Sequence, residues 1–232
     1  MEVIVLAGGL GTRLQGVIGQ YPKCMAQVNG RPFLSWLFQY LAGQSCTRVI
    51  LSLGFRHDVV TEWLATQQLP FVVDYVIETE PLGTGGGMQL ALRETVADNV
   101  IVVNGDTMFC ADLPAQMEYH RHLHASVTLG LKVMHRFDRY GVVNTNRNGR
   151  IISFEEKQYR DEGLINAGVY IINTRAYLDK ELPLKHSFEK DYLERFVPEG
   201  KFYGYTGDGY FIDIGIPEDY DRAQTDFKTL FA

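Results

Sequence analysis

A glycine-rich turn between an apolar segment and an arginine is the clearest chemical feature of this chain. It contains Leu6, Ala7, Gly8, Gly9, Leu10, Gly11, Thr12 and Arg13, directly after the apolar residues 3–5. Glycines let the backbone turn tightly and bring its N–H groups against phosphate oxygens, and a guanidinium adds a planar fork of donors. The turn therefore predicts a loop that binds the phosphates of a nucleoside triphosphate.

Two better-known nucleotide loops fit this turn poorly. A Walker loop ends in Gly-Lys-Ser/Thr, whereas Gly11 is followed by Thr12 and Arg13. The dinucleotide fingerprint needs a glycine where Leu14 stands, because that glycine lets helix and strand pack closely. A dehydrogenase that binds a nicotinamide dinucleotide is therefore a weaker alternative. Taken alone, the turn could also be an ordinary connection after a strand.

Two aspartates further along the chain are candidate ligands for a divalent cation. Asp106 comes after the apolar residues 100–103 and directly follows a glycine. Asp213 directly follows residues 210–212, two of which are aromatic. A carboxylate displayed from the end of a strand can bind a hard cation such as Mg²⁺. Gly-Asp is also common in turns, so neither aspartate identifies a metal site by itself.

Seven short segments occur in the order seen in one enzyme family. They are residues 8–14, Pro22-Lys23, residues 80–86, Asn104-Gly105-Asp106, Glu155-Glu156-Lys157, residues 166–170 and Asp213-Ile214-Gly215. Over nearly its whole length the chain resembles the sugar-1-phosphate nucleotidyltransferases. Within that family, residues 137–141, 187–191 and 210–220 are most similar to D-glycero-α-D-manno-heptose 1-phosphate guanylyltransferases.

The resemblance implies a set of catalytic residues and one cofactor, Mg²⁺. It implies that Asp106 and Asp213 bind the metal ion and that Arg13 contacts the β- and γ-phosphates. Lys23 would reach the reacting phosphates, and Lys157 would hold the sugar phosphate. Cations are needed because the reaction brings two mutually repelling anions together and releases a third, pyrophosphate.

The resemblance also implies contacts to both substrates. The nucleotide contacts are Leu6, Ala7, Gly8, Gly9, Gly11, Thr12, Arg13, Glu78, Glu80, Gly83 and Thr84. The sugar-phosphate contacts are Tyr140, Gly141, Glu156, Lys157, Asn166 and Gly168. A carboxylate can accept both donors on the pairing edge of guanine, so Glu78 or Glu80 could recognise GTP. Uridylyltransferases have similar Glu-Pro-Leu segments, which leaves the base open. Asp138 and Arg139 could bind the additional hydroxyls of a heptose, or form an exposed ion pair.

The order of the predicted elements indicates an α/β fold that can bring these residues together. Apolar runs that suit buried strands span residues 3–6, 48–53, 71–77 and 100–103. Helical spacing of apolar residues marks residues 33–44, 58–66, 87–93 and 113–123. The alternation predicts a doubly wound, mostly parallel mixed sheet, which is the Rossmann-like fold of the family. Its ligands would lie beyond the carboxyl ends of the strands.

The second half of the chain is predicted to be richer in strands, with antiparallel pairing. The expected strands are residues 126–133, 141–144, 151–155 and 167–172, followed by a helix capped by Ser187 and another that begins at Pro217. We expect a single domain over residues 1–232, without the β-helix extension of larger relatives. Residues 1–123 would mainly bind the nucleotide and residues 124–232 mainly the sugar phosphate.

Composition limits the partners and the compartment. The chain has 232 residues and a formal net charge of −6, and its basic residues are scattered, so no nucleic acid is expected. Cys24, Cys46 and Cys110 show no disulfide or zinc spacing, which fits a reducing cytoplasm. Neither an export signal nor a membrane span is apparent, and no membrane partner is expected. Monomer and homodimer both remain open.

The expected activity is transfer of GMP from GTP to D-glycero-α-D-manno-heptose 1-phosphate, giving GDP-heptose and pyrophosphate for a bacterial glycan precursor. One alternative is a related transferase that uses UTP, CTP or dTTP with a hexose or N-acetylated sugar phosphate. Another is a noncatalytic protein that senses nucleotide sugars. The sensor is disfavoured because the five catalytic candidates Arg13, Lys23, Asp106, Lys157 and Asp213 are all present.

Overall fold

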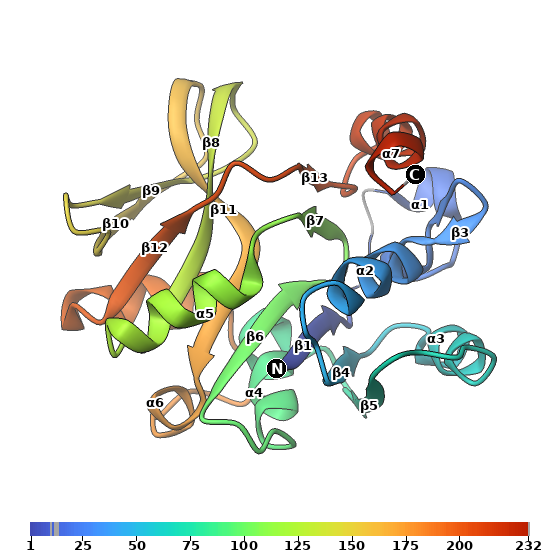
Figure 1. Ribbon diagram of the computed structural model, residues 1–232, viewed down its shortest axis with the longest axis horizontal. Helices are drawn as coiled ribbons and strands as arrows, with labels where there is room; N and C mark the ends of the chain where they lie inside the picture. Colours follow the sequence, from blue (N-terminus) through green and yellow to red (C-terminus); the bar gives the residue numbers. More distant parts are fainter. Residues whose placement is uncertain (10, 12–13, 232) are drawn as a thin grey trace.

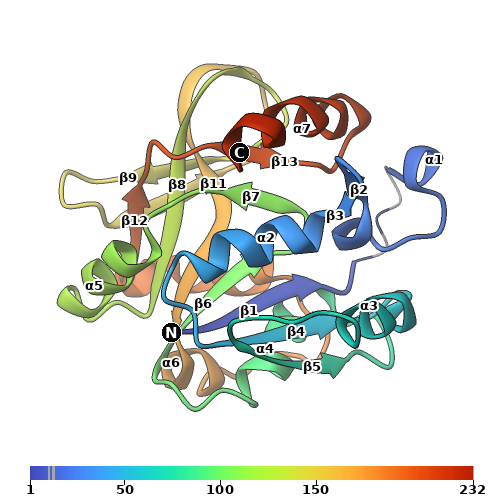
Figure 2. The same ribbon diagram turned by 45° about the vertical axis from the view of Figure 1, so that its right-hand side comes forward.

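A nine-stranded mixed sheet forms the centre of the molecule, and helices cover both of its faces (Figures 1 and 2). The computed structural model describes residues 1–9, 11 and 14–231. The main path of the sheet has the order β10-β9-β11-β6-β1-β4-β5, and β8 pairs with both β11 and β12. This arrangement confirms the predicted mixed, doubly wound α/β fold.

The elements of the first half are β1 (Glu2–Ala7), α1 (Gln15–Ile18), η2 (Lys23–Met25), β2 (Gln27–Val28), β3 (Arg31–Pro32), α2 (Phe33–Ala42), β4 (Arg48–Leu53), α3 (His57–Leu64), β5 (Val72–Ile77), α4 (Gly83–Leu92), β6 (Asn99–Asn104), β7 (Thr107–Phe109) and α5 (Leu113–His122). Those of the second half are β8 (Val127–Phe137), β9 (Val142–Thr145), β10 (Ile151–Glu155), β11 (Arg160–Asn173), α6 (Thr174–Leu178), η3 (Phe188–Glu194), η4 (Val197–Glu199), β12 (Phe202–Thr206), β13 (Phe211–Asp213) and α7 (Pro217–Leu230).

The strand order reverses beside β1. From β1 the chain continues to β4 and β5 on one side, and then returns to β6 on the other side, with all of these neighbours parallel. The loops that follow β1 and β6 therefore diverge at the carboxyl edge of the sheet, where open α/β sheets bind ligands. This is where the sequence predicted that the glycine turn and Asp106 would meet.

Burial on both faces explains why residues 3–7 of β1 are a continuous apolar run. Val3 and Val5 of β1 face a core that includes residues of α2, α5 and α7, whereas Ile4 faces a core that includes residues of α4, α6 and η3. All three side chains are fully buried. Because successive residues of a strand point to opposite faces, both sets must be apolar.

β11 is longer than the predicted strand over residues 167–172 and joins the two halves of the sheet. Residues 160–166 pair with the outer part of β8, and residues 169–173 pair with β6. The register shifts between Asn166 and Tyr170, where Gly168 has a φ of +72°. A glycine tolerates this left-handed conformation, and the resulting bulge directs side chains toward the site described below.

Packing also extends α4 beyond the predicted start at residue 87. The helix begins at Gly83 and contains Gly85 and Gly86 in its first turn, although glycine is a poor helix former. A Cβ on Gly85 would lie 2.3 Å from the ring of His186, and one on Gly86 would lie 2.4 Å from the carbonyl oxygen of Leu184. Glycine is therefore needed because the chain near residue 186 packs directly on this turn.

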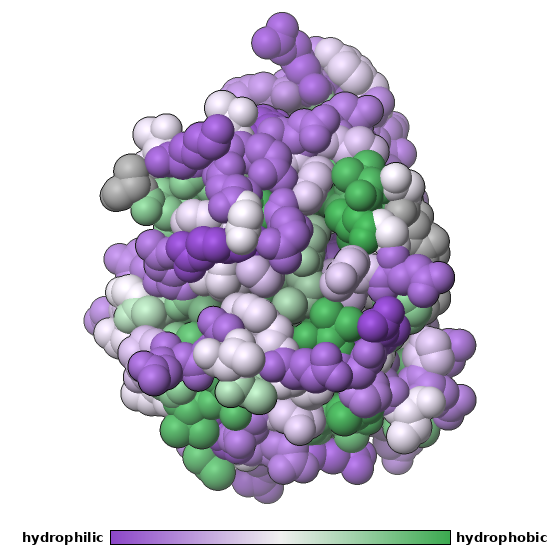
Figure 3. All heavy atoms as spheres, turned by 90° about the vertical axis from the view of Figure 1, so that its right-hand side faces the viewer, coloured by the Kyte–Doolittle hydropathy of each residue, from purple (hydrophilic) through white to green (hydrophobic). Residues whose placement is uncertain are grey.

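The two later helical starts agree with the sequence. Ser187 Oγ accepts a hydrogen bond from the backbone N–H of Lys190 at the start of η3, a π-helical segment, and Pro217 is the first residue of α7. None of the described helices has the length and apolar character to cross a bilayer. The face that carries α1, α3 and α7 is mainly hydrophilic, and its apolar residues form separate small patches (Figure 3).

Candidate functional site

Two adjoining cavities open at the carboxyl edge of the sheet. The first has a volume of about 390 Å³ and the second about 430 Å³. Asn104, Tyr170 and Glu189 line both of them. Each cavity is lined by residues from both halves of the chain, 1–123 and 124–232. The two cavities therefore share part of their walls.

The glycine turn forms one wall of the first cavity. Its described lining residues are Leu6, Ala7, Gly8, Gly9 and Gly11, whereas Thr12 and Arg13 lie outside the described residues. A Cβ on Gly8 would lie only 2.4 Å from Oε1 of Glu78, and Gly11 has a φ of +63°. Both positions therefore need glycine, one for space and the other for its backbone conformation.

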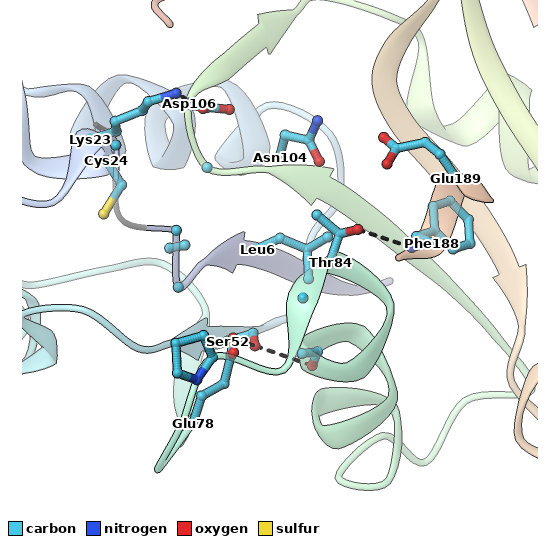
Figure 4. Close-up of a pocket in the computed structure, with 18 of the residues that line it drawn as sticks. Leu6, Lys23, Cys24, Ser52, Glu78, Thr84, Asn104, Asp106, Phe188 and Glu189 are labelled. Carbon is cyan, nitrogen blue, oxygen red and sulfur yellow. Dashed lines mark hydrogen bonds and ion pairs between the residues drawn. The ribbon is translucent and has the colours of Figure 1, made fainter. Parts of the chain in front are cut away.

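One end of the first cavity carries an ion pair between a lysine and an aspartate. Nζ of Lys23, the first residue of η2, lies 2.9 Å from Oδ2 of Asp106, which follows β6 (Figure 4). The two side chains are 15% and 28% exposed, so both groups remain accessible to a ligand in the cavity. A lysine and a carboxylate side by side suit a ligand that brings both phosphates and a metal ion.

The small sheet formed by β7 and β13 brings Asp213 close to Asp106. Asp213 pairs with Thr107, and the backbone N–H of Ile214 donates to the carbonyl oxygen of Asp106 at 3.0 Å. Asp213 lines the second cavity, and its Oδ1 accepts the N–H of Gly215 at 2.8 Å. Two aspartates that are distant in sequence are thus displayed from neighbouring backbone segments.

This pair fits a metal ion that arrives with a substrate. Among the described residues there is no group of three or more His, Cys, Asp or Glu side chains that could hold a metal ion. Mg²⁺ is commonly bound by one or two carboxylates together with substrate phosphates, so it does not need such a group. Asp106 and Asp213 have the right chemistry for that mode of binding.

The other end of the first cavity carries Glu78. Figure 4 shows Glu78 and Ser52 at the end away from Lys23 and Asp106. Oε2 of Glu78 accepts the N–H of Leu82 at 3.0 Å. Its Oε1 lies 3.4 Å from the hydroxyl of Ser52, which has a shorter hydrogen bond of 3.1 Å to the carbonyl oxygen of Gly87. The carboxylate is therefore fixed in place while it lines the cavity.

Glu80, the other candidate for base recognition, is exposed and does not line the cavity. The two remaining nucleotide candidates of this segment, Gly83 and Thr84, do line it. They form the first turn of α4, whose amino end carries a partial positive charge. The N–H groups of Gly85 and Gly86 in the same turn donate to the carbonyl oxygen of His186. The hydroxyl oxygen of Thr84 accepts the N–H of Phe188, which ties α4 to η3.

The second cavity brings together all of the predicted sugar-phosphate contacts. The lining includes Tyr140, Gly141, Glu156, Lys157, Asn166 and Gly168. Lys157 and Glu156 are exposed at the end of β10, and Nζ of Lys190 lies 3.6 Å from Oε1 of Glu156. The amide of Asn166 donates to the hydroxyl of Tyr170 at 3.0 Å and accepts the N–H of Gly168.

The wall shared by the cavities was not assigned from the sequence. Tyr170 is buried in this wall, and burial together with the negative charges of Glu189 and Asp106 raises the pKa of its phenol. Asn104 and Glu189 belong to segments that carry the family resemblance, which was the available signal. Their placement in both cavities depends on contacts between β6, β11 and η3, which no local pattern reveals.

Asp138 and Arg139 do not line either cavity among the described residues. Asp138 is exposed, whereas Arg139 pairs with Asp219 of α7 and donates to the hydroxyl of Tyr140 at 2.9 Å. The expectation that both residues bind sugar hydroxyls is therefore not supported by their positions. The alternative was an exposed ion pair between the two, but Arg139 pairs with Asp219 instead, in a half-buried contact.

Comparison with known proteins identifies the family. The sequence model described as nucleotidyl transferase matches residues 2–229. The chain belongs to the nucleotidyl transferase family. A D-glycero-alpha-D-manno-heptose 1-phosphate guanylyltransferase of Aneurinibacillus thermoaerophilus is 46% identical over 98% of this chain and 99% of the relative. The protein of the same name from Campylobacter jejuni is 41% identical over 95% and 97% of the two chains.

Among solved structures, this nucleotidyl transferase is similar to HddC from Yersinia pseudotuberculosis. That structure is 38% identical, has a TM-score of 0.88, and covers 97% of this chain and 99% of its own. A second structure of HddC, in complex with GMP-PN, has a TM-score of 0.87 at the same identity. The predicted family and its fold are thereby confirmed.

Proposed function

We propose that this nucleotidyl transferase moves a guanylyl group from GTP to D-glycero-α-D-manno-heptose 1-phosphate and releases pyrophosphate. The observation that carries the proposal is the meeting of the two cavities at Asn104, Tyr170 and Glu189. A triphosphate in one cavity and a sugar phosphate in the other would place their reacting phosphates at this junction. The names of the relatives from A. thermoaerophilus and C. jejuni support the choice of sugar.

The charged groups suit direct transfer between two anions. Lys23 lies at the first cavity and Lys157 at the second, so each substrate phosphate has a cation that offsets the mutual repulsion. An oxygen of the sugar phosphate would attack the α-phosphorus in line, and pyrophosphate would leave. No covalent nucleophile is required, and burial raises the pKa of the nearby Cys24 thiol to about 12, which keeps it protonated.

We further propose that the cofactor is Mg²⁺ and that Asp106 and Asp213 hold it. When bound, the ion would neutralise charge on the triphosphate and the departing pyrophosphate. Lys23 would exchange its present contact with Asp106 for a phosphate oxygen, because the carboxylate would then face the cation. Arg13 is proposed to contact the β- and γ-phosphates.

A cytoplasmic location is also proposed. The free cysteines Cys24, Cys46 and Cys110 support it, because thiols stay reduced in that compartment.

Guanine specificity is proposed to rest on Glu78. Its carboxylate lies at the end of the cavity away from Lys23, and the base of a bound nucleotide would lie at that end. A carboxylate can accept the two adjacent donors of guanine together, whereas the pairing edges of uracil and thymine present only one donor. The HddC complex with GMP-PN supports the use of a guanine nucleotide.

A substrate panel tests this function. Purified protein is incubated with each of GTP, UTP, CTP and dTTP and with heptose, mannose, glucose and N-acetylglucosamine 1-phosphates, and pyrophosphate release is measured. The proposal expects the highest kcat/KM for GTP with the heptose 1-phosphate. A higher value for another base or sugar would replace that part of the proposal, and nucleotide binding without any release would favour the sensor.

A further inference from the structure

A chain of charged and phenolic groups surrounds the strand that displays Asp213. The guanidinium of Arg139 donates to the hydroxyl of Tyr140 at 2.9 Å and also to the carboxylate of Asp219. On the other oxygen of Asp219, Nη2 of Arg222 lies at 3.1 Å. Asp219 is only 7% exposed, so its charge depends on these two partners.

The same chain continues to the residue before β13. Nε of Arg222 lies 3.8 Å from Oδ2 of Asp226, and the hydroxyl of Tyr210 donates to that carboxylate oxygen at 2.6 Å. One tyrosine of the chain, Tyr140, lines the sugar-phosphate cavity, and the other, Tyr210, leads directly into β13. The polar groups of α7 therefore connect one wall of that cavity to the strand that carries Asp213.

Aromatic packing joins the same two parts. The ring of Tyr140 packs edge-on against Phe211 of β13, with ring centroids 5.7 Å apart, and the guanidinium of Arg139 lies 5.4 Å from the ring of Tyr140. Arg139 thus holds Tyr140 by its ring and by its hydroxyl, while its second bond reaches the first turn of α7. Because Tyr140 is held at these two points, its side chain has little rotational freedom.

We propose that Arg139 and Asp219 are positioning residues for the sugar-phosphate site, because their ion pair holds Tyr140 and residues 137–141 against the Asp213 strand. Neither residue is among the described residues that line the two cavities. Arg139 therefore does not read the sugar itself; it acts through Tyr140. The inference rests on the proposed function for the assignment of the second cavity to the sugar phosphate, whereas the contacts of Arg139 are present without any substrate.

The first test needs no substrate. Hydrogen exchange of backbone amides in residues 137–143 is followed in the wild type, Arg139→Met and Asp219→Asn. Both variants are expected to exchange faster in this segment. The control is Glu199→Gln, which removes the negative charge from the Lys180–Glu199 ion pair of 2.5 Å, neither residue of which lines either of the two cavities. Unchanged exchange in residues 137–143 would overturn the proposal whatever reaction the enzyme catalyses.

The second test separates positioning from direct contact. With whichever sugar 1-phosphate the substrate panel identifies, both variants are expected to raise its KM about tenfold while leaving the KM for the triphosphate unchanged. In the double variant the effects should not multiply, because both substitutions remove one ion pair. Arg139→Lys, which keeps the charge, should recover part of the loss. Multiplied effects, or an equal rise in both KM values, would refute the positioning role.

Discussion

Glu78 and Glu80 are separated by one residue and have the same side chain, yet only Glu78 lines the nucleotide cavity. The carboxylate of Glu78 is fixed by Leu82 and Ser52, whereas Glu80 is exposed. Residues two apart in an extended strand would point to the same face, but β5 ends at Ile77 and the chain bends at residues 79 and 80, so the two side chains diverge.

Glu78→Gln should reduce base discrimination. Glutamine can still accept the N–H of Leu82, but its amide cannot accept both donors of guanine, which is worth about 1–3 kcal/mol. The ratio of kcat/KM for GTP to that for UTP should fall by about tenfold to a hundredfold. Glu80→Gln is the matched control and should leave this ratio unchanged. If the two variants behave alike, Glu78 does not read the base.

Asp106→Asn and Asp213→Asn should each lower kcat by about a thousandfold, because each removes a charge that stabilises the metal ion and the departing pyrophosphate. Asp208→Asn, at an exposed aspartate in the same segment as Asp213, is the control and should retain activity. Chelation of divalent cations should abolish turnover of the wild type, and added Mg²⁺ should restore it. Full activity in the presence of chelator would contradict the proposed cofactor.

At the scale of elements, α5 depends on a buried neutral histidine. His120 is 1% exposed, and its ring nitrogens contact Thr128 of β8 at 2.8 Å and Asn99 of β6 at 3.1 Å. Burial lowers the pKa of His120 from 6.5 to about 4. Protonation of His120 would therefore place an unfavourable buried charge between α5 and the sheet.

This attachment predicts a pH dependence of stability. Below pH 6.5 the unfolded chain binds a proton at His120 that the folded protein does not accept until pH falls to about 4. The free energy of unfolding should therefore fall by roughly 2 kcal/mol between pH 7.5 and pH 5. Urea titrations at both pH values measure this loss. In His120→Gln, the free energy of unfolding should differ less between the two pH values. Equal differences in the two proteins would argue against a neutral His120.

Local patterns predicted the type and the central residues of each element well, but they predicted its first and last residues less well. The strand at residues 48–53 coincides with β4, because residues 49–53 are all buried and only Ser52 among them is polar. The outer part of β8 continues to Phe137, although the apolar run ends at Val133. Those additional residues are held by pairing with β11, which is a contact between distant segments.

At the scale of the whole molecule, the last helix packs against one of the first. Phe227 of α7 is fully buried, and its ring contacts those of Phe33, Trp36 and Tyr210. Tyr220 and Gln224 of the same helix hydrogen-bond the carbonyl oxygen of Gln27 in β2. The C-terminal helix therefore stabilises the N-terminal half of the site as well as the Asp213 strand.

Phe227→Ala should lower the free energy of unfolding by about 3–5 kcal/mol, because it leaves a cavity among aromatic rings. Thr225→Ala, on the exposed side of the same helix, should change it by at most about 0.5 kcal/mol. Urea unfolding followed by tryptophan fluorescence measures both, since Trp36 contacts the Phe227 ring. A loss below about 1 kcal/mol would show that α7 does not anchor this half.

The sequence alone determined the fold class, the position of the glycine turn after β1 and most residues around the two cavities. These features depend on local chemistry: apolar runs form strands that are buried on both faces, and glycines and charged residues follow the strands at their ends. The tertiary structure alone decided that Glu78 rather than Glu80 lines the nucleotide cavity and that Arg139 faces Asp219 rather than a sugar. It also placed Asn104, Tyr170 and Glu189 in the wall that the two cavities share. Such choices arise from packing between segments far apart in the chain, because the direction of a side chain is set by its neighbours in space.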